Sequence, residues 1–298
     1  MKRFRFPLAV LFLSLFIISC DNDDDNDDVM LDNMLTLDIK YLENLGADEV
    51  YEGWIVVDGK PVSTGTFTVD DDGKLSKTTF TVDEMYLIAA TDFVLSIEPA
   101  NDDDPAPSAI KILGGSFSES SADVSVSHGA ALGSTFKSAA GKYILATPTT
   151  NSMEDELSGV WFLSLESGAP AVGLNLPELP SGWAYEGWAV IDGMPVSTGT
   201  FTEVDMADNA APYSGTDNLG PSFPGEDFIQ NAPDGLTFPT DLSGTTVVIS
   251  IEPSPDNSSA PFMFKPLVAP VMEDAMDHKT YDFMNKVAET FPMGTVTR

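Results

Sequence analysis

The sequence predicts an all-β protein made of two tandem, homologous β-sandwich units, with a short helix near the C-terminus. Two observations carry this prediction. A stretch of nineteen residues occurs twice, and the remaining chain consists largely of short apolar runs separated by Gly, Pro, Asn, Asp and Ser. Short strands with turn residues at such spacing are typical of sandwiches and barrels.

The two copies are residues 51–69, YEGWIVVDGKPVSTGTFTV, and residues 185–203, YEGWAVIDGMPVSTGTFTE, which are identical at 15 of 19 positions. A second echo follows each copy, LSIEP at residues 95–99 and ISIEP at residues 249–253. The first echo is spaced by 134 residues and the second by 154, so the later copy carries an insertion of about twenty. Self-similarity in a fixed order indicates a duplicated structural unit.

Each copy has the pattern of a β-hairpin. In the first, the apolar run at residues 52–57 leads into Asp58-Gly59, a strong signal for a two-residue turn. Asp192-Gly193 occupies the same place in the second copy. A glycine within each returning strand indicates a bulge or a close backbone approach: Gly65 and Gly199.

The other candidate strands are short apolar or alternating runs. In the first unit the strands are residues 35–41, 52–57, 62–69, 78–82, 93–99, 109–113 and 123–126. Further along they are residues 142–147 and 160–165, expected to form a longer hairpin, and 245–253 and 262–268, expected to close the second sheet. Residues 277–291 have helical spacing of apolar side chains, which predicts the C-terminal helix.

These elements divide the chain into five parts. The parts are a signal peptide at residues 1–19, an acidic tether at 20–33, repeat 1 at 34–128, a connection and hairpin at 129–159, and repeat 2 at 160–298. Repeat 2 contains a segment that holds the added residues, 204–242, which is dense in Gly, Pro, Asp and Asn and is called the insertion below. A loop of that length is usually functional or mobile.

Composition limits the partners that the protein can have. Among 298 residues, 47 are acidic and 14 are basic, which gives a formal net charge of −33. We therefore expect no nucleic-acid partner, because a phosphate backbone requires a basic face. Anionic lipid headgroups are disfavoured for the same reason. A hydrophobic content of 43% is sufficient for packed cores.

The N-terminus has the layout of a secretory leader. Lys2, Arg3 and Arg5 precede an apolar run at residues 8–18 that is too short for a membrane-spanning helix, and the run ends in Ile-Ile-Ser-Cys20. This ending resembles the lipobox of bacterial lipoproteins. The resemblance implies cleavage before Cys20 and acylation of Cys20, including a palmitate-type chain, so that the bilayer is a partner through this residue. The alternative for this single cysteine is a buried free thiol.

Six aspartates lie within residues 21–28, directly after Cys20. A block of like charges stays extended and solvated, so one interpretation is a flexible spacer. A second is that the run resembles the acidic export tether of surface-displayed lipoproteins. A third is calcium binding, although the run lacks the glycine and distal glutamate of an EF-hand loop. We expect a location in the cell envelope, at the outer membrane, on its periplasmic face or on the cell surface.

Residues 176–201, LPELPSGWAYEGWAVIDGMPVSTGTF, and less completely residues 42–67, resemble the extracytoplasmic C-terminal domain of the anti-sigma-K factor family. The shared features are a lead-in rich in Leu and Pro, a strand with aromatic-acid-x-Trp, a Gly turn and a return ending in Gly-Thr-Phe. The resemblance implies an all-β extracytoplasmic module. Family members carry a cytoplasmic sigma-binding segment and a transmembrane helix before this domain. A leader ending in a lipidated cysteine leads us to expect that this part is lacking.

The sequence offers few groups for catalysis. His128 and His278 lie in no metal-ligand spacing, and no nucleophile elbow or phosphate-binding glycine pattern occurs. We predict no metal, no cofactor and no enzymatic activity. Two pairs of glutamates recur at matching positions, Glu52 with Glu98 and Glu186 with Glu252. Such pairs could perform glycosidic acid–base chemistry, but a site copied within a repeat is more simply structural, for instance a glutamate that caps backbone N–H groups.

The repeated tryptophans, Trp54 and Trp188, leave a similar choice. They could form a platform that stacks on sugar rings, or they could anchor the core of each sandwich, which is the favoured interpretation. The predicted function is a non-catalytic, envelope-anchored binding or structural module whose further ligand is an unknown protein or glycan. The alternatives are an accessory component of envelope-stress signalling and a glycan-acting or calcium-dependent hydrolase.

Overall fold

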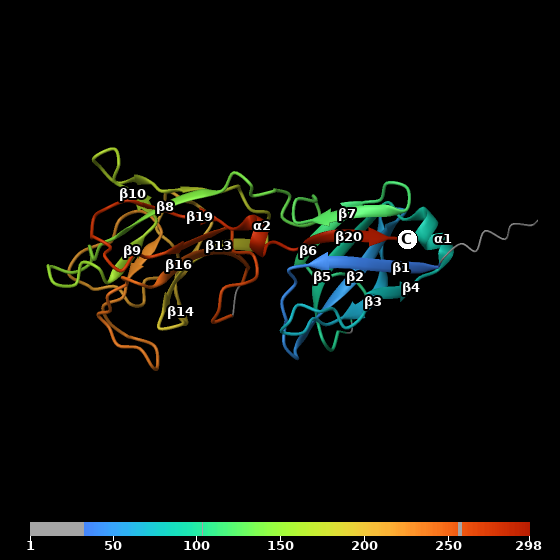
Figure 1. Cartoon of the computed structure of the whole chain (residues 1–298), viewed down its shortest axis with the longest axis horizontal. Coiled ribbons are helices and arrows are strands. Elements are labelled where there is room, and N and C mark those ends of the chain that lie inside the picture. The colour runs from blue at the N-terminus through green and yellow to red at the C-terminus, as the bar shows by residue number, and fades with distance from the viewer. Residues whose placement is uncertain (1–32, 103, 256–257) are drawn as a thin grey trace, which may run out of the picture. The chain divides into compact units, whose positions relative to one another are not determined.

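The structure is a computed structural model that describes residues 33–102, 104–255 and 258–298. The predicted signal peptide, Cys20 and the acidic run lie outside the described residues. The described chain is nearly all β, which confirms the predicted fold class (Figure 1). No helix among these residues has the length and apolar content needed to cross a membrane.

Repeat 1 consists of two layers of four strands. The hairpin layer runs in the order β3 (Lys60–Phe67), β2 (Glu49–Val57), β5 (Asp92–Pro99) and β6 (Lys111–Ser116). The second layer runs β7 (Ser121–Ser125), β20 (Met293–Thr297), β1 (Met34–Lys40) and β4 (Thr79–Thr81). The layers join where Gly114 of β6 pairs with Ser125 of β7. At the opposite edge, the rings of Phe67 and Phe80 lie 6.1 Å apart, so β3 and β4 also meet.

Repeat 2 has a corresponding hairpin layer, with the order β14 (Met194–Phe201), β13 (Trp183–Ile191), β16 (Thr246–Pro253), β17 (Leu267–Pro270) and β19 (Met284–Asn285). Its second layer runs β12 (Leu174–Asn175), β8 (Ala140–Leu145), β9 (Gly159–Trp161) and β15 (Gly225–Asp227), with β18 (Tyr281–Asp282) paired to β8. Two short strands, β10 (Leu163–Ser164) and β11 (Ala171–Val172), pair with each other. The predicted hairpin between residues 142–147 and 160–165 is confirmed by the antiparallel pairing of β8 with β9.

The two units share the order of their hairpin layers. The first four strands are β3-β2-β5-β6 in repeat 1 and β14-β13-β16-β17 in repeat 2, and in both units these strands follow one another in the same order along the chain. The short strand that comes after the hairpin, β4 or β15, lies at one end of the second layer, but the other strands of that layer differ: β7 follows β6, whereas β12 comes before β13. The shared hairpin layer is what a duplicated unit predicts.

The hairpins adopt the predicted turn and bulge. Asp58 and Gly59 have φ angles of 50° and 73°, and Asp192 and Gly193 have φ angles of 52° and 81°. Two successive residues with positive φ match the twist of the flanking strands. In both copies the register shifts by one residue just before the tryptophan, opposite the glycine of the returning strand. The predicted bulge is therefore confirmed.

The predicted helix at residues 277–291 is wrong over most of its length. The helical part is α2, Val287–Thr290, and residues 281–285 form β18 and β19 instead. Tyr281 lies opposite Tyr143 of β8, and the two rings stack at 5.5 Å. Strand pairing in this context overrides a short helical periodicity. A second helix that the sequence did not indicate, α1 (Glu84–Ala89), begins at Asp83, whose carboxylate accepts the N–H of Met85 at 2.8 Å.

The predicted division of the chain differs from the observed one at two strands. β20, from the end of the chain, lies in the second layer of repeat 1 between β7 and β1, as Figure 1 shows by the red strand between green and blue ones. β8, from the predicted connection, belongs to repeat 2. Repeat 1 is therefore completed by the last residues of the chain. Val296 of β20 is fully buried, which explains why this strand stays in the sheet.

Candidate functional site

Each unit contains a buried chain of polar side chains that begins at its repeated tryptophan. In repeat 1, the indole N–H of Trp54 donates to Ser96 Oγ at 2.8 Å, and the hydroxyl of Ser96 donates to Glu98 Oε1. Glu98 also accepts the backbone N–H of Ser108, at 2.8 Å and 3.1 Å from its two oxygens. We call this arrangement the Trp–Ser–Glu chain. It connects β2, β5 and the end of the loop that precedes β6.

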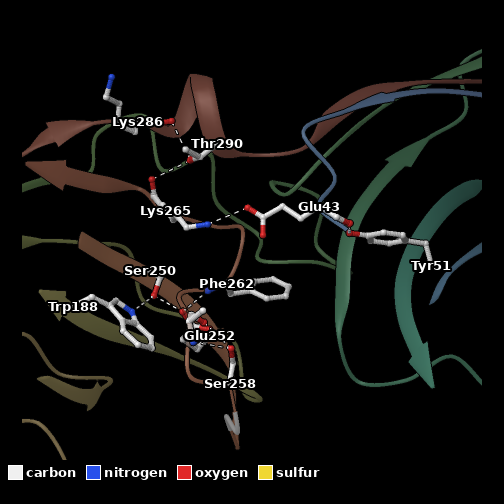
Figure 2. A network of polar contacts seen from close by, with 11 residues as sticks. Glu43, Tyr51, Trp188, Ser250, Glu252, Ser258, Phe262, Lys265, Lys286 and Thr290 are labelled. Carbon is white, nitrogen blue, oxygen red and sulfur yellow. Dashed lines mark hydrogen bonds and ion pairs between the residues drawn. The ribbon is translucent and has the colours of Figure 1, made fainter. Parts of the chain in front are cut away.

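Repeat 2 contains the same chain (Figure 2). The indole N–H of Trp188 donates to Ser250 Oγ at 2.8 Å, the hydroxyl of Ser250 donates to Glu252, and Glu252 accepts the backbone N–H of Phe262 at 2.8 Å. The polar surroundings of the two tryptophans thus match down to individual hydrogen bonds. Serine is the member of this chain that the sequence did not single out, although the repeated SIEP motif contains it.

Burial decides what the Trp–Ser–Glu chains can do. The exposed fractions are 3% for Trp54 and 1% for Trp188, so neither indole ring offers a face to a sugar. Glu98 and Glu252 are 2% and 0% exposed, and each one holds a backbone N–H of the following loop. Each of these side chains joins a strand of the hairpin layer to the loop that follows it, which is a structural role. They do not lie in an open cleft, as hydrolysis of a glycosidic bond would require.

The other two predicted glutamates stabilise the bulges. Glu52 accepts the hydroxyl of Ser63, and Glu186 accepts that of Ser197, in each case across the hairpin. The same serine oxygens accept the N–H of the bulge glycines, at 3.2 Å from Gly65 and 3.0 Å from Gly199. Partial burial raises the pKa of Glu52, and the hydrogen bond from Ser63 opposes this effect.

A pocket lies in repeat 2, and most of the residues that line it belong to the insertion and not to the repeated motif. The pocket has a volume of about 590 Å³ and is lined by Trp161 of β9, Gly225 of β15 and residues of the insertion between 207 and 222. The aromatic side chains of the insertion, Tyr213, Phe228 and Phe238, pack on one another with ring centroids 5.5 to 6.0 Å apart. Phe228 belongs to the main hydrophobic core, and Tyr213 and Phe238 pack against it, so the insertion is held on the core and the wall of the pocket is fixed.

Asp208 lines this pocket and anchors the insertion to the hairpin. Its Oδ2 accepts the N–H of Gly225 at 2.9 Å, and its side chain packs on the bulge glycine Gly199. The next residue, Asn209, continues the contact, because its N–H donates to Thr200 O at 3.0 Å and its Oδ1 accepts the N–H of Thr200 at 3.0 Å. These bonds cover the outer edge of β14, which would otherwise present unpaired backbone groups. Burial, reinforced by the charge of Glu226, raises the pKa of Asp208 to about 8.

Two more carboxylates lie behind the pocket wall on β15, and both are fully buried. Glu226 accepts the hydroxyl of Ser214 and the N–H of Asp227 at 3.1 Å, and burial raises its pKa to about 7. Asp227 accepts the indole N–H of Trp161 at 2.8 Å and both the N–H, at 2.9 Å, and the hydroxyl of Thr149. Burial also raises the pKa of Asp227. These side chains join the insertion to β9 and to the loop at residue 149.

Residues 30–110 match a protein-family model described as the C-terminal part of the anti-sigma-K factor rskA. The match supports the family resemblance of repeat 1. It covers β1 to β5 and contains the whole Trp54–Ser96–Glu98 chain. No curated protein and no solved structure matches the chain. The likeness of repeat 2 to repeat 1 rests on the shared sequence, strand pairing and hydrogen bonds described above.

Sequence reasoning missed Asp208, Glu226 and Asp227. The available signal was the run Gly-Glu-Asp-Phe-Ile at residues 225–229, in which acids sit beside apolar residues as in a buried strand. At the place that Asp208 occupies against Gly199, repeat 1 has the ring of Phe80 against Gly65. Among the described residues, no group of three or more His, Cys, Asp or Glu side chains has a geometry that could hold a metal ion.

Proposed function

We propose that the protein is a non-catalytic binding module that an acylated Cys20 holds at the cell envelope, and that its ligand site is the pocket of the insertion. The observation that carries this proposal is the pocket itself. It is built largely by the segment that distinguishes repeat 2 from repeat 1, beside a hairpin layer that the two units share. Extra chain placed on a duplicated framework is a common way for a binding site to arise on an existing fold.

The distribution of carboxylates favours binding over hydrolysis. Asp208 is the one acidic side chain among the described residues that line the pocket. Glu226 and Asp227 lie behind the wall, fully buried and engaged with donors from the protein. A glycosidase needs two carboxyl groups that flank the bond to be cleaved. One accessible carboxyl can orient a ligand but cannot supply such a pair.

Membrane attachment is the second part of the proposal. It rests on the leader at residues 1–19 and on the position of Cys20 at its end. Acyl chains on Cys20 would anchor the protein, since each buried methylene contributes about 0.8 kcal/mol. Mass spectrometry of the purified protein should show an acylated Cys20 at the mature N-terminus. Cys20→Ser should move the protein from the membrane fraction to the soluble fraction, and an unmodified Cys20 with the leader retained would refute the anchor.

The binding site can be tested although the ligand is unidentified. The full chain, purified in a mild detergent, is screened by thermal unfolding against a library of glycans, metabolites and peptides. A ligand at 100 times its Kd stabilises a protein by about 2.7 kcal/mol, which such a screen detects. Ala211→Trp, at an exposed position that lines the pocket, should abolish the shift. Ala47→Trp, at an exposed loop position in repeat 1, is the matched control and should preserve it. A ligand that stabilises both variants equally would place the site elsewhere.

A second candidate function, an accessory role in envelope-stress signalling, is favoured by the family match at residues 30–110. In that case the partner would be another envelope protein. Deletion of the gene would then change transcription that depends on an alternative sigma factor, and the change would be complemented by the Ala211→Trp variant. Complementation by this variant separates a signalling role of repeat 1 from ligand binding in repeat 2.

A further inference from the structure

On the basis of the proposed function, we infer that the pocket of the insertion takes a neutral, hydroxyl-rich ligand, namely a segment of an uncharged glycan. The volume of about 590 Å³ lies within the range of about 300 to 1,000 Å³ that is usual for small-ligand sites. The pocket is thus large enough for a small organic ligand, and its chemistry decides which class of ligand fits.

The lining residues offer hydrogen bonds without positive charge. They include amides and hydroxyls such as Asn209, Thr216, Asn218 and Ser222, and no Lys, Arg or His is among the described residues that line the pocket. A phosphate, sulfate or carboxylate ligand would find no cationic partner there. Anionic ligands are therefore disfavoured, because the lining supplies no positive charge to pair with them.

A cationic ligand is disfavoured by the state of Asp208. Because its pKa is raised to about 8, this side chain is largely protonated at neutral pH and carries little charge to attract an amine. A neutral carboxyl group both donates and accepts a hydrogen bond. The hydroxyl and acetamide groups of a glycan have the same dual capacity. The lining thus matches a ligand that is neutral and rich in donors and acceptors.

The apolar part of the lining suits the C–H faces of sugar rings. It consists mainly of small side chains, among them Ala207, Ala210 and Ala211, together with Pro221 and the exposed Leu219. Trp161 is 4% exposed and forms the base of the pocket beneath Gly220, whose lack of a side chain lets the loop lie on the indole ring. Small residues leave space for a ring to approach the polar groups closely.

The walls are already held in place without a ligand. Asn218 Nδ2 donates to Thr150 O at 3.1 Å and to Asn151 Oδ1 at 3.2 Å, which ties the outer loop to the loop after β8. Gln230 Nε2 donates to Ser214 O at 2.6 Å. A wall that is ordered beforehand lowers the entropy cost of binding. A rigid, polar and uncharged pocket is what recognition of a soluble neutral sugar requires.

The test is isothermal titration of the full chain in detergent with four probes, after a glycan array has shown which neutral structures are retained. The probes are maltohexaose and chitohexaose as neutral glycans, heparin as a polyanion and spermidine as a polyamine. We expect binding of a neutral glycan, a weakening of at least tenfold in Asp208→Ala and loss of binding in Ala211→Trp. Ala47→Trp should bind like the unchanged protein. Circular dichroism and the unfolding midpoint of each variant show whether it is folded.

The outcomes separate the ligand class from the proposed function. Binding of heparin or spermidine that Ala211→Trp abolishes, with no binding of neutral glycans, would refute the ligand class and leave the pocket as the binding site. Neutral glycan binding that is the same in Ala211→Trp and in the unchanged protein would refute the site and with it the proposed function. If the protein binds no neutral glycan on the array, the inference is also overturned. The proposed function is then still decided by the library screen.

Discussion

The buried acids of the insertion should make the protein less stable as the pH rises from acidic to mildly alkaline values. Burial raises the pKa of Glu226 from 4.5 to about 7 and that of Asp208 from 3.8 to about 8. In the unfolded chain both groups return to ordinary values near 4. Between these limits the folded protein binds protons that the unfolded chain has released, so the free energy of unfolding falls as the pH increases.

The size of the effect follows from Glu226, which is fully buried. A shift from 4.5 to about 7 is about 2.5 pH units, and each unit corresponds to about 1.36 kcal/mol, so the loss is about 3 kcal/mol. The stabilisation is fully present below about pH 4, falls through the interval and is gone above about pH 7. Asp208 also lowers the free energy of unfolding as the pH rises to about 8. Because this side chain is partly exposed, water screens its charge and makes its contribution smaller.

Glu226→Gln isolates this effect. Glutamine keeps an oxygen that accepts from Ser214 and from the N–H of Asp227, but it never becomes charged. Its NH₂ group would lie near the N–H of Tyr213, which now donates to Glu226 Oε2 at 3.4 Å, and that cost is the same at every pH. Relative to the unchanged protein, the variant should therefore gain about 3 kcal/mol on going from pH 4 to pH 9.

The assay is urea unfolding at pH 4, 5, 7 and 9, followed by tryptophan fluorescence. Glu154→Gln, at an exposed position, is the matched control and should follow the pH profile of the unchanged protein. Parallel profiles for Glu226→Gln and the unchanged protein would show that the charge of Glu226 is not the cause. A free energy of unfolding that rises with pH over this range would refute the reasoning about burial altogether.

Three further predictions concern the framework. Ser250→Ala should lower the free energy of unfolding by about 1 to 3 kcal/mol in urea, because the buried N–H of Trp188 would lose its acceptor. A similar cost of Ser250→Ala in a Trp188→Phe background would contradict this reason. Gly187→Ala should lower the free energy of unfolding by about 1 to 3 kcal/mol or more, since its methyl group would overlap the ring of Phe162. Gly129→Ala is the control and should change little, because the space around Gly129 is open. Equal costs for the two variants would refute the packing argument. Deletion of residues 293–298 removes β20 from between β7 and β1, and limited proteolysis should then cleave repeat 1 rapidly; unchanged protection would show that the strand is dispensable.

The family resemblance and the repeated motif pointed to residues that hold each hairpin layer together. The interpretation of a glutamate that caps backbone N–H groups agrees with the contacts of Glu98 and Glu252. The serine between each tryptophan and glutamate was not predicted, because the sequence around a serine in an apolar run does not show which residue it will bind. The C-terminal strand escaped notice for a similar reason, since Met293–Thr297 has neighbours that lie far away in the sequence.

The sequence by itself determined the features that depend on a few adjacent residues. Asp58-Gly59 and Asp192-Gly193 form their turns because they tolerate positive φ, and the bulges follow from glycines in fixed positions, so local conformational preference was enough. Only the tertiary structure decided the burial of Asp208, Glu226 and Asp227, because desolvation depends on what the rest of the chain places over a carboxyl group. The same holds for the membership of β20 in repeat 1, since hydrogen bonding between strands is set by which edges meet in space and not by order along the chain.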